Sequence, residues 1–349
     1  MAVDLSKIAS KKKISLDELR GKTIAIDAYN MVYQFLWIIR HPDGRPLEDA
    51  NGNVTSQLSG FFYRTIEMME KGIRPIYVFD GMPSILKQKT ITSRIRRREE
   101  AYGEWKRAVA EGNMEKAKTS AQASTRITKA IVADSKNLLD LMGVPYIDAP
   151  SEGEAQASTM CASGVVHAAA SQDYDTLLFG SPLVVRNLSF SGKRKLPNKN
   201  VYVQVDPELM DLKATLESNG ITREQLIFIG IMLGTDFNDG VKGIGPKTAL
   251  KIARQLGSIA ELKEYIKQKY SEEFELDVQE VFDLFMKPEV KEVSAQQVES
   301  MFRSRVDSEA LVRFMCEEHG FDQQRIERQT ERLLKLSGSI KQESINKWF

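Results

Sequence analysis

The chain has 349 residues, which at about 150 residues per domain indicates one large domain or two ordinary ones. Its 42% hydrophobic content can bury a core, and 49 basic against 48 acidic residues give a net charge of +1, which excludes wholesale disorder and a uniformly basic coat. The sequence predicts a soluble cytoplasmic protein, because it has no apolar run long enough to span a membrane and no signal-peptide pattern. Its two cysteines are far apart, so we expect neither a disulfide framework nor a zinc cage.

Apolar runs typical of strands alternate with helical patterns along most of the chain. One helical pattern spans Thr55–Lys71, two or three helices are expected within residues 84–142, and a charged helix is expected over Asp322–Leu336. This alternation predicts an α/β fold with a mostly parallel, twisted central sheet flanked by helices. The expected strands each run into an aspartate: Thr23–Ile26 before Asp27, Pro75–Phe79 before Asp80, and Val165–Ser171 before Asp173.

Local charge is uneven although the total is near neutral. Lys87–Arg107 and Arg186–Lys199 each carry a net charge of +5, and Gly240–Ala260 adds four basic residues and no acidic one. Glu261–Asp283 carries a net charge of −5. Each run alone is typical of a solvated helix or loop face, but together they predict a basic face that follows phosphates.

Acidic residues stand at the ends of the expected elements. One alone would be an ordinary turn former or helix cap, and Ser151 with Glu154 fits a capping box. Because the carboxyl ends of parallel strands meet at one edge, folding should crowd these carboxylates together. Such crowding needs a compensating cation, and oxygen ligands without histidine or cysteine suit magnesium or manganese. Seven carboxylates predict two metal ions and phosphodiester chemistry: Asp27, Asp80, Glu152, Glu154, Asp173, Asp175 and Asp236.

The motifs around these residues are IAIDAYN, YVFDGMP, APSEGEAQA, ASQDYD and GTDF. In this order and spacing they resemble the XPG-like structure-specific 5′ nucleases, most closely the archaeal flap endonuclease-1 branch, over essentially the whole chain. The resemblance implies a PIN-like nuclease core with a helical arch and a helix–hairpin–helix-type element. It also implies that the seven carboxylates bind two Mg²⁺ ions, with Mn²⁺ as the alternative. Ala2 departs from the family, which usually has glycine there.

The resemblance also divides the chain into regions. Residues 1–98 form an N-terminal nuclease region that includes the start of the arch, and 116–258 an internal nuclease region with the helix–hairpin–helix-type element. Residues 259–337 are expected to form a helical region that packs on the core, and 338–349 a tail.

Gly240–Lys247 joins two helical patterns. The exposed amides of a helix that starts at Pro246 can bind phosphate, although a simple helix–turn–helix corner has the same pattern. The resemblance implies that this element grips duplex backbone, assisted by Lys247 and Lys251. It further implies a potassium ion held by the main chain of Gly240, Val241 and Ile244.

Lys87, Arg94 and Arg98 fall on one stripe of an expected helix, which could be an ordinary charged face. The resemblance implies instead a mobile arch in which Lys87 and Arg94 contact the scissile phosphate. Tyr33, by itself more typical of a core residue, matches the aromatic that stacks on a terminal base. The other DNA-binding positions that the resemblance implies are Arg40, Arg64, Arg98, Glu152, Gly234 and Asp236.

The tail places Ile345, Trp348 and Phe349 at i, i+3 and i+4, so one helical turn would present them on one face. They could pack on the protein's own core. With Gln342 the spacing also fits the motif that binds a sliding clamp of the PCNA type.

The leading interpretation is a monomeric, magnesium-dependent 5′-flap endonuclease with 5′–3′ exonuclease activity, acting on branched DNA in replication and repair. The alternatives are a sibling 5′ exonuclease or junction resolvase, a small-molecule phosphatase, and a non-catalytic, clamp-tethered scaffold that binds branched DNA. A scaffold needs the basic surfaces but not the acidic residues, so the complete set of seven carboxylates favours an enzyme.

Overall fold

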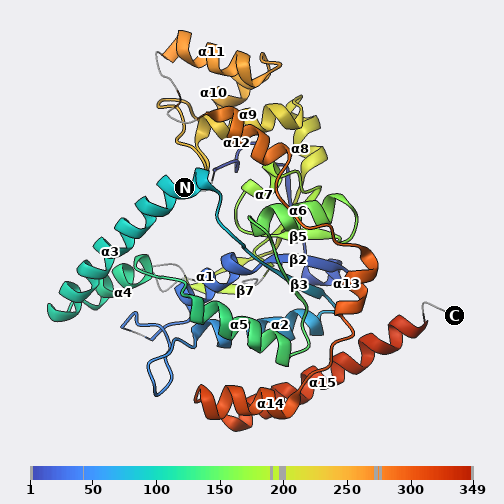
Figure 1. The fold of residues 1–349 in the computed structure, drawn as a ribbon. Coiled ribbons are helices and arrows are strands. Elements are labelled where there is room, and N and C mark those ends of the chain that lie inside the picture. Colours follow the sequence, from blue (N-terminus) through green and yellow to red (C-terminus); the bar gives the residue numbers. More distant parts are fainter. Residues whose placement is uncertain are drawn as a thin grey trace.

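The computed structural model describes residues 3–41, 43–188, 192–195, 202–270, 274 and 277–346. A seven-stranded mixed sheet lies at its centre, in the order β1-β9-β6-β5-β2-β3-β4, and a separate two-stranded hairpin is formed by β7 and β8 (Figure 1). The strands are β1 Lys11–Lys13, β2 Thr23–Asp27, β3 Arg74–Phe79, β4 Tyr146–Asp148, β5 Ala168–Ala170, β6 Leu183–Arg186, β7 Gly192–Lys195, β8 Tyr202–Val205 and β9 Glu208–Asp211.

The five strands from β6 to β4 run parallel, and only β9 and β1 add antiparallel pairs at one edge. This confirms the predicted mostly parallel sheet. The strand expected over Val165–Ser171 is shorter in the structure, because the chain turns after Ala170. That turn is closed by the Asp173 amide, which donates to the Ser171 hydroxyl at 3.1 Å.

Helices cover both faces of the sheet (Figure 1). Helices α1, α2, α5, α14 and α15 share one apolar core with the sheet, α6 and α13 bury the other face, and α7 and α9–α12 enclose a third cluster. The helices are α1 Ala28–Ile38, α2 Ser56–Glu70, α3 Gln88–Ala110, α4 Met114–Ala123, α5 Lys129–Leu141, α6 Gly153–Ala162, α7 Asp175–Leu178, α8 Leu212–Asn219, α9 Arg223–Leu233, α10 Pro246–Ala253, α11 Ile259–Tyr270, α12 Val278–Met286, α13 Ala295–Met301, α14 Ser308–Arg313 and α15 Gln323–Asn346. Short 3-10 turns lie at Leu16–Leu19 and Ile85–Lys87, and a π turn at Phe314–Glu318.

Helix α1 lies directly on α2 because Gly60 has no side chain. A Cβ atom at Gly60 would lie 2.1 Å from the Phe35 ring, which is fully buried. The Phe35 ring also packs edge-on against Phe61, with 5.3 Å between ring centroids. This contact fixes the height of α1 above α2.

Helices α3 and α4 form a helical hairpin that projects from the body of the protein (Figure 1), and we call residues 88–123 the arm. The two helices approach closely because their facing residues are small. These buried residues are Ala101 and Ala108 of α3, and Ala117, Ser120 and Ala121 of α4.

The loop after α1 is tied to the C-terminal helices. Asp49 accepts hydrogen bonds from the backbone amides of Asn51 and Asn53 and contacts the Nδ1 atom of the buried His319 at 3.2 Å. Arg40 connects the same loop to α1, since it donates to the carbonyl oxygens of Leu36 and Gly44, each at 2.6 Å. It also bonds the Thr125 hydroxyl, just beyond the arm.

The C-terminal helix is longer than the sequence predicts. We expected it to end near Leu336, but α15 continues to Asn346 and takes in the start of the expected tail. No glycine-induced break occurs at Gly338. Separately, no helix among the described residues is both long and apolar enough to cross a membrane.

Candidate active site

The carboxyl ends of neighbouring strands bring the predicted acidic residues together. Asp27 ends β2 and caps α1, where it accepts from the Asn30 amide at 3.0 Å. Asp80 follows β3, and Asp173 follows β5. A cleft of about 700 Å³ is lined by six of the seven carboxylates, all except Asp175, which is buried. We call the seven residues the carboxylate cluster: Asp27, Asp80, Glu152, Glu154, Asp173, Asp175 and Asp236.

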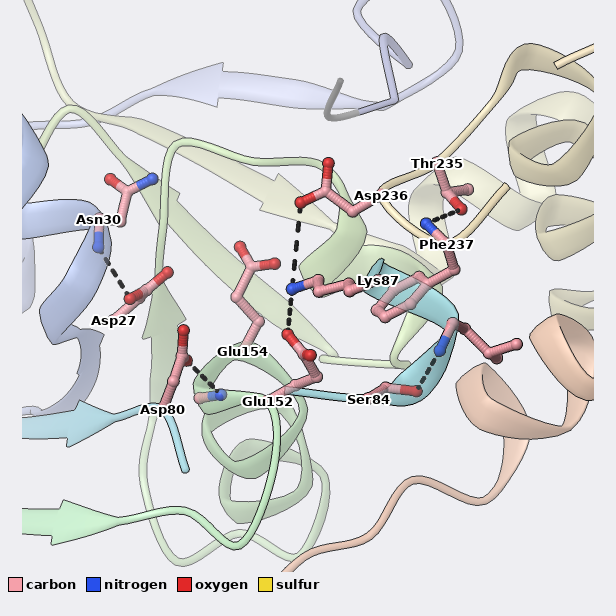
Figure 2. A network of polar contacts seen from close by, with 12 residues as sticks. Asp27, Asn30, Asp80, Ser84, Lys87, Glu152, Glu154, Thr235, Asp236 and Phe237 are labelled. Atoms are coloured by element: carbon pink, nitrogen blue, oxygen red, sulfur yellow. Dashed lines mark hydrogen bonds and ion pairs between the residues drawn. The ribbon is translucent and has the colours of Figure 1, made fainter. Parts of the chain in front are cut away.

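Two cations from the base of the arm reach into the carboxylate cluster. Figure 2 shows the Lys87 amino group between Glu152 and Asp236: it contacts Glu152 Oε2 and lies 3.9 Å from Asp236 Oδ2. One nitrogen of Arg94 lies 2.6 and 2.7 Å from the two oxygens of Asp236. Lys87 also sits over the Phe237 ring, 5.0 Å from its centroid. The predicted stripe therefore places Lys87 and Arg94 against the acidic residues.

Polar neighbours that the sequence did not single out orient the carboxylates. The Gly153 amide donates to Asp80 Oδ1 at 2.7 Å, and a Cβ at Gly153 would lie 2.6 Å from that oxygen. Asn30 Nδ2 donates to Asp173 Oδ2 at 3.2 Å. Glu154 accepts from the hydroxyls of Ser171, at 2.5 Å, and Thr176, at 3.1 Å. Asn30 had one signal in the sequence, its place three residues after an expected helix cap.

The capping-box interpretation of Ser151 and Glu154 is wrong. Helix α6 begins at Gly153, and its cap residue is Glu152, which makes no side-chain capping bond. Glu154 turns instead toward the cluster, where Ser171 and Thr176 hold it. The Glu154 side chain bonds the hydroxyls of Ser171 and Thr176 and not a backbone amide at the start of α6, because these hydroxyls reach it inside the buried site.

Burial makes the charges of this cluster unfavourable. It raises the pKa of Asp80 to about 6, with Glu152 adding to the effect, and the pKa of Asp175 to about 7, with Asp236 and Asp173 adding. The pKa values of Asp27 and Glu154 are also raised by burial and then by neighbouring carboxylates. Burial opposes the charged form of Lys87, but Glu152 and Asp80 outweigh it and raise the Lys87 pKa.

The donor set of the cluster fits hard divalent cations, although its present arrangement is not a closed coordination shell. Within the described residues, no three His, Cys, Asp or Glu side chains converge tightly enough to hold a metal ion. Lys87 and Arg94 lie among the carboxylates instead. The acidic oxygens are nevertheless of the type that magnesium binds, and Asp175 Oδ1 is buried without a hydrogen-bond partner. A cation would satisfy that oxygen.

The other predicted DNA-binding residues lie in different settings. Tyr33, which is 38% exposed, and Arg98 line the cleft. Arg40 uses its guanidinium within the protein, and Arg64 forms an exposed pair with Glu67 at 2.6 Å. Their predicted contacts to DNA stay predictions.

The loop between α9 and α10 matches the expected helix–hairpin–helix-type element. Gly234 ends α9 with a φ of 89°, and Gly245 caps α10, in which Pro246 is the first residue and Lys247 and Lys251 are exposed. No side chain caps the start of α10, so its amides are available. The Val241 carbonyl accepts from Ile244 N at 3.2 Å, and the potassium prediction for Gly240, Val241 and Ile244 stays open.

The structure describes only some of the residues named in the predictions for the two ends of the chain. Gln342 and Ile345 fall within α15, but Ala2, Trp348 and Phe349 lie outside the described residues. Close to the start, the Val3 amide partly offsets the rise of the Asp175 pKa, a contribution that the sequence did not indicate.

Comparison with known proteins assigns the family. The family model of the XPG N-terminal domain matches residues 2–101, and that of the XPG I-region matches 143–236. Flap endonuclease 1 of Pyrococcus furiosus is 47% identical, with 100% of this chain and 99% of the relative covered. Flap endonuclease 1 of Methanosarcina acetivorans is 45% identical, and both chains are covered completely. The chain belongs to the flap endonuclease 1 family of XPG nucleases.

Solved structures place the fold in the same group. Flap endonuclease-1 from Methanococcus jannaschii superposes with a TM-score of 0.74 at 37% identity, covering 97% of this chain and 99% of the other. The catalytic core of Rad2 in complex with DNA substrate gives a TM-score of 0.67 at 25% identity, covering 96% and 100%. The predicted nuclease core of the XPG flap endonucleases is thereby confirmed, while the roles of individual residues are not tested by these likenesses.

Proposed function

We propose that this protein cuts one phosphodiester near the junction of a 5′-flapped duplex, using two divalent metal ions held by the carboxylate cluster. Its family makes it a structure-specific flap endonuclease and hence a nuclease acting on DNA. The comparisons give no support to the non-catalytic scaffold. The observation that carries the proposal is the convergence of acidic strand ends with Lys87 and Arg94 in one cleft at the base of the arm.

The cluster residues would share two Mg²⁺ ions, or Mn²⁺, which supply a water of lowered pKa and stabilise the leaving oxygen. Ser171 and Thr176 hold Glu154, and Asn30 holds Asp173, so the carboxylates are oriented before substrate arrives. Lys87 and Arg94, already beside Asp236, would bind the scissile phosphate and stabilise the charge that grows on it. Tyr33 would stack on the base next to the cut.

The duplex would be held by its backbone. The uncapped start of α10 offers amides to a phosphate, and Lys247 and Lys251 add positive charge on the same short helix. A potassium ion at the main chain of Gly240, Val241 and Ile244 would add to this grip. Arg40, Arg64, Arg98 and Gly234 are further proposed DNA contacts, next to Glu152 and Asp236. Such contacts recognise shape and not sequence.

The regions named from the sequence have matching proposed roles. Residues 1–98 and 116–258 form the nuclease parts, 259–337 supports them, and 338–349 binds a sliding clamp of the PCNA type through Gln342, Ile345, Trp348 and Phe349. We further propose that a monomer works in replication and repair in the cytoplasm, and that a 5′–3′ exonuclease activity accompanies flap cleavage.

The deciding experiment is cleavage of an end-labelled 5′-flap duplex in magnesium and in EDTA, with wild type beside Asp173→Ala. We expect a single magnesium-dependent cut near the junction, lost in the variant while flap binding is kept. Tight binding by the wild type without any cut, in magnesium or manganese, would favour the scaffold instead.

The tail has its own test. Deleting Gln342–Phe349 should remove stimulation by the sliding clamp and leave unassisted cleavage unchanged. Loss of unassisted cleavage would show that these residues serve the fold. A variant with Trp348→Ala and Phe349→Ala distinguishes the motif from the length of the helix.

A further inference from the structure

The basic stripe of the arm continues into an aromatic surface that the proposed chemistry does not use. Arg94 and Arg98 line the cleft, and Tyr102 and Trp105 follow them along α3. At 100° per residue these four side chains lie within about 80° of one another around the helix. The stripe therefore runs from the carboxylate cluster toward the tip of the arm without a change of face.

The aromatic part is exposed and carries positive charge. Tyr102 is 45% exposed, and the Trp105 ring lies beside it, with 5.5 Å between centroids and 39° between ring planes. The amino group of Lys106 lies 4.6 Å from the centroid of the Tyr102 ring. Trp105 is half-buried, and the buried residues between α3 and α4 are small ones, so the packing of the two helices does not need Tyr102.

An exposed aromatic within a basic stripe is the arrangement that binds single-stranded nucleic acid, because every base has a face that can stack. We propose that Tyr102, with Lys106 beside it, is a stacking site for one base of the single-stranded 5′ flap. The proposal rests on the proposed function, since a flap that enters the cleft would pass along the same stripe. Lys106 and the neighbouring Arg107 would meet the phosphates on either side of the stacked base.

The length of α3 predicts which base is bound. Tyr102 lies 15 residues beyond Lys87, or about 22 Å along a helix. A strand with stacked bases advances by about 3.4 Å per nucleotide, so the site is roughly six nucleotides from the cut, and fewer if the strand is stretched. Flaps of one or two nucleotides cannot reach Tyr102, whereas flaps of ten can.

The test compares the affinities of the full chain for 5′-flap duplexes of one and ten nucleotides, measured by fluorescence anisotropy in EDTA so that no cut occurs. Tyr102→Ala should weaken binding of the ten-nucleotide flap about tenfold and leave the one-nucleotide flap unchanged. Tyr102→Trp should restore the wild-type affinity. The matched control is Met114→Ala, since Met114 is a similarly exposed apolar residue of the arm, at 49%, and should affect neither flap.

A second measurement locates the base without depending on a variant that folds. Abasic sites are placed singly along a ten-nucleotide flap and tested on the wild type. An abasic site about four to six nucleotides from the junction should weaken binding as much as Tyr102→Ala does, and should have no further effect in that variant. Equal loss for both flaps in Tyr102→Ala, or abasic sites without any positional effect, would overturn the stacking site. A wild type that fails to bind either flap would overturn the proposed function itself.

Discussion

Acidic side chains occur in two contrasting settings in this molecule. Asp49, in the loop after α1, receives hydrogen bonds from Asn51, Asn53 and His319, and the bonds from Asn53 lead the causes that lower the Asp49 pKa to about 2. In the carboxylate cluster, burial and like charge raise the pKa values of Asp80 and Asp175 instead. The residue type is the same, but hydrogen-bond donors lower the pKa in the loop, whereas burial and neighbouring carboxylates raise it in the cluster.

The difference separates residues that stabilise the fold from residues that the fold must tolerate. A carboxylate whose charged form is favoured in the folded state contributes to stability, whereas one whose charged form is disfavoured reduces it. The cluster is partly neutralised by Lys87 and Arg94, but Asp175 Oδ1 has no partner. Such groups mark a site that is built for a ligand and not for stability.

Replacing one carboxylate in each setting by its amide should have opposite consequences for cleavage activity and for thermal stability. Asp175→Asn should lower flap cleavage at least about 10³-fold, because a proposed metal ligand is lost, and leave the melting temperature of the metal-free protein equal or higher. Asp49→Asn, its matched control, should cut normally and melt earlier. Single-turnover cleavage and thermal denaturation in EDTA measure both. An active Asp175→Asn enzyme would contradict the role of the cluster.

Lys87 and Arg94, at the base of the arm, should matter nearly as much for the rate of cleavage. Lys87→Ala and Arg94→Ala should each slow single-turnover cleavage about 10²–10³-fold, or about 3–4 kcal/mol of barrier, since both would stabilise growing charge. Lys89→Ala is the control, because Lys89 stands in the same turn but pairs with the exposed Asp239. Wild-type rates for Arg94→Ala would remove its proposed role.

Lys87 should also stabilise the metal-free protein. Lys87→Met leaves Glu152 without its cation, and removing one partner of a largely buried pair lowers the free energy of unfolding by about 3 kcal/mol. Saturating magnesium should raise the melting temperature of this variant more than that of the wild type, because ions binding only the folded state would replace the missing charge. Calorimetry with magnesium and with EDTA checks this, and an equal gain in both proteins would argue that Lys87 does not compensate the cluster.

The smallest expected effect is the change of thermal stability with pH that Asp49 causes. Because its pKa is lowered by folding, its contribution to stability is present above the ordinary value of 3.8 and is lost as the pH falls toward about 2. Asp49→Asn should therefore lower the melting temperature by about 1–2 °C at pH 7, and the difference should shrink below pH 4. Melting curves from pH 7 to 3 measure it. A difference that grows in acid would have the wrong sign.

Much of the site could be predicted because strand ends follow from local apolar patterns. Asp27, Asp80 and Asp173 were found from the runs that precede them, and a parallel sheet brings such ends together. Gly153 and Ser171 could not be predicted as partners of Asp80 and Glu154, because the two contacts join residues that are 73 and 17 positions apart in the sequence.

The errors have local causes. The pattern at Ser151 and Glu154 is a valid capping signal, but the hydroxyls of Ser171 and Thr176 hydrogen-bond the Glu154 side chain instead. The expected end of the last helix near Leu336 relied on Gly338, and a single glycine lowers helix stability by only about 1 kcal/mol, which α15 tolerates. Arg40 illustrates a further limit, because the sequence does not show that its guanidinium bonds Leu36, Gly44 and Thr125 within the protein. Its predicted contact with DNA stays a prediction.

The close contact between Gly60 and the Phe35 ring limits how far α1 can move relative to the acidic strand ends. We call the space above Gly60 a notch. Phe35 rests in that notch and fixes α1, whose first turn carries Asn30 and whose cap is Asp27. A single methyl group at Gly60 would have to lift α1 or displace the Phe35 ring, and an error of about 1 Å at reacting groups is enough to slow an enzyme about a hundredfold. The positions of Asp27 and Asn30 at the acidic edge therefore depend on how the buried, apolar side of α1 packs on α2.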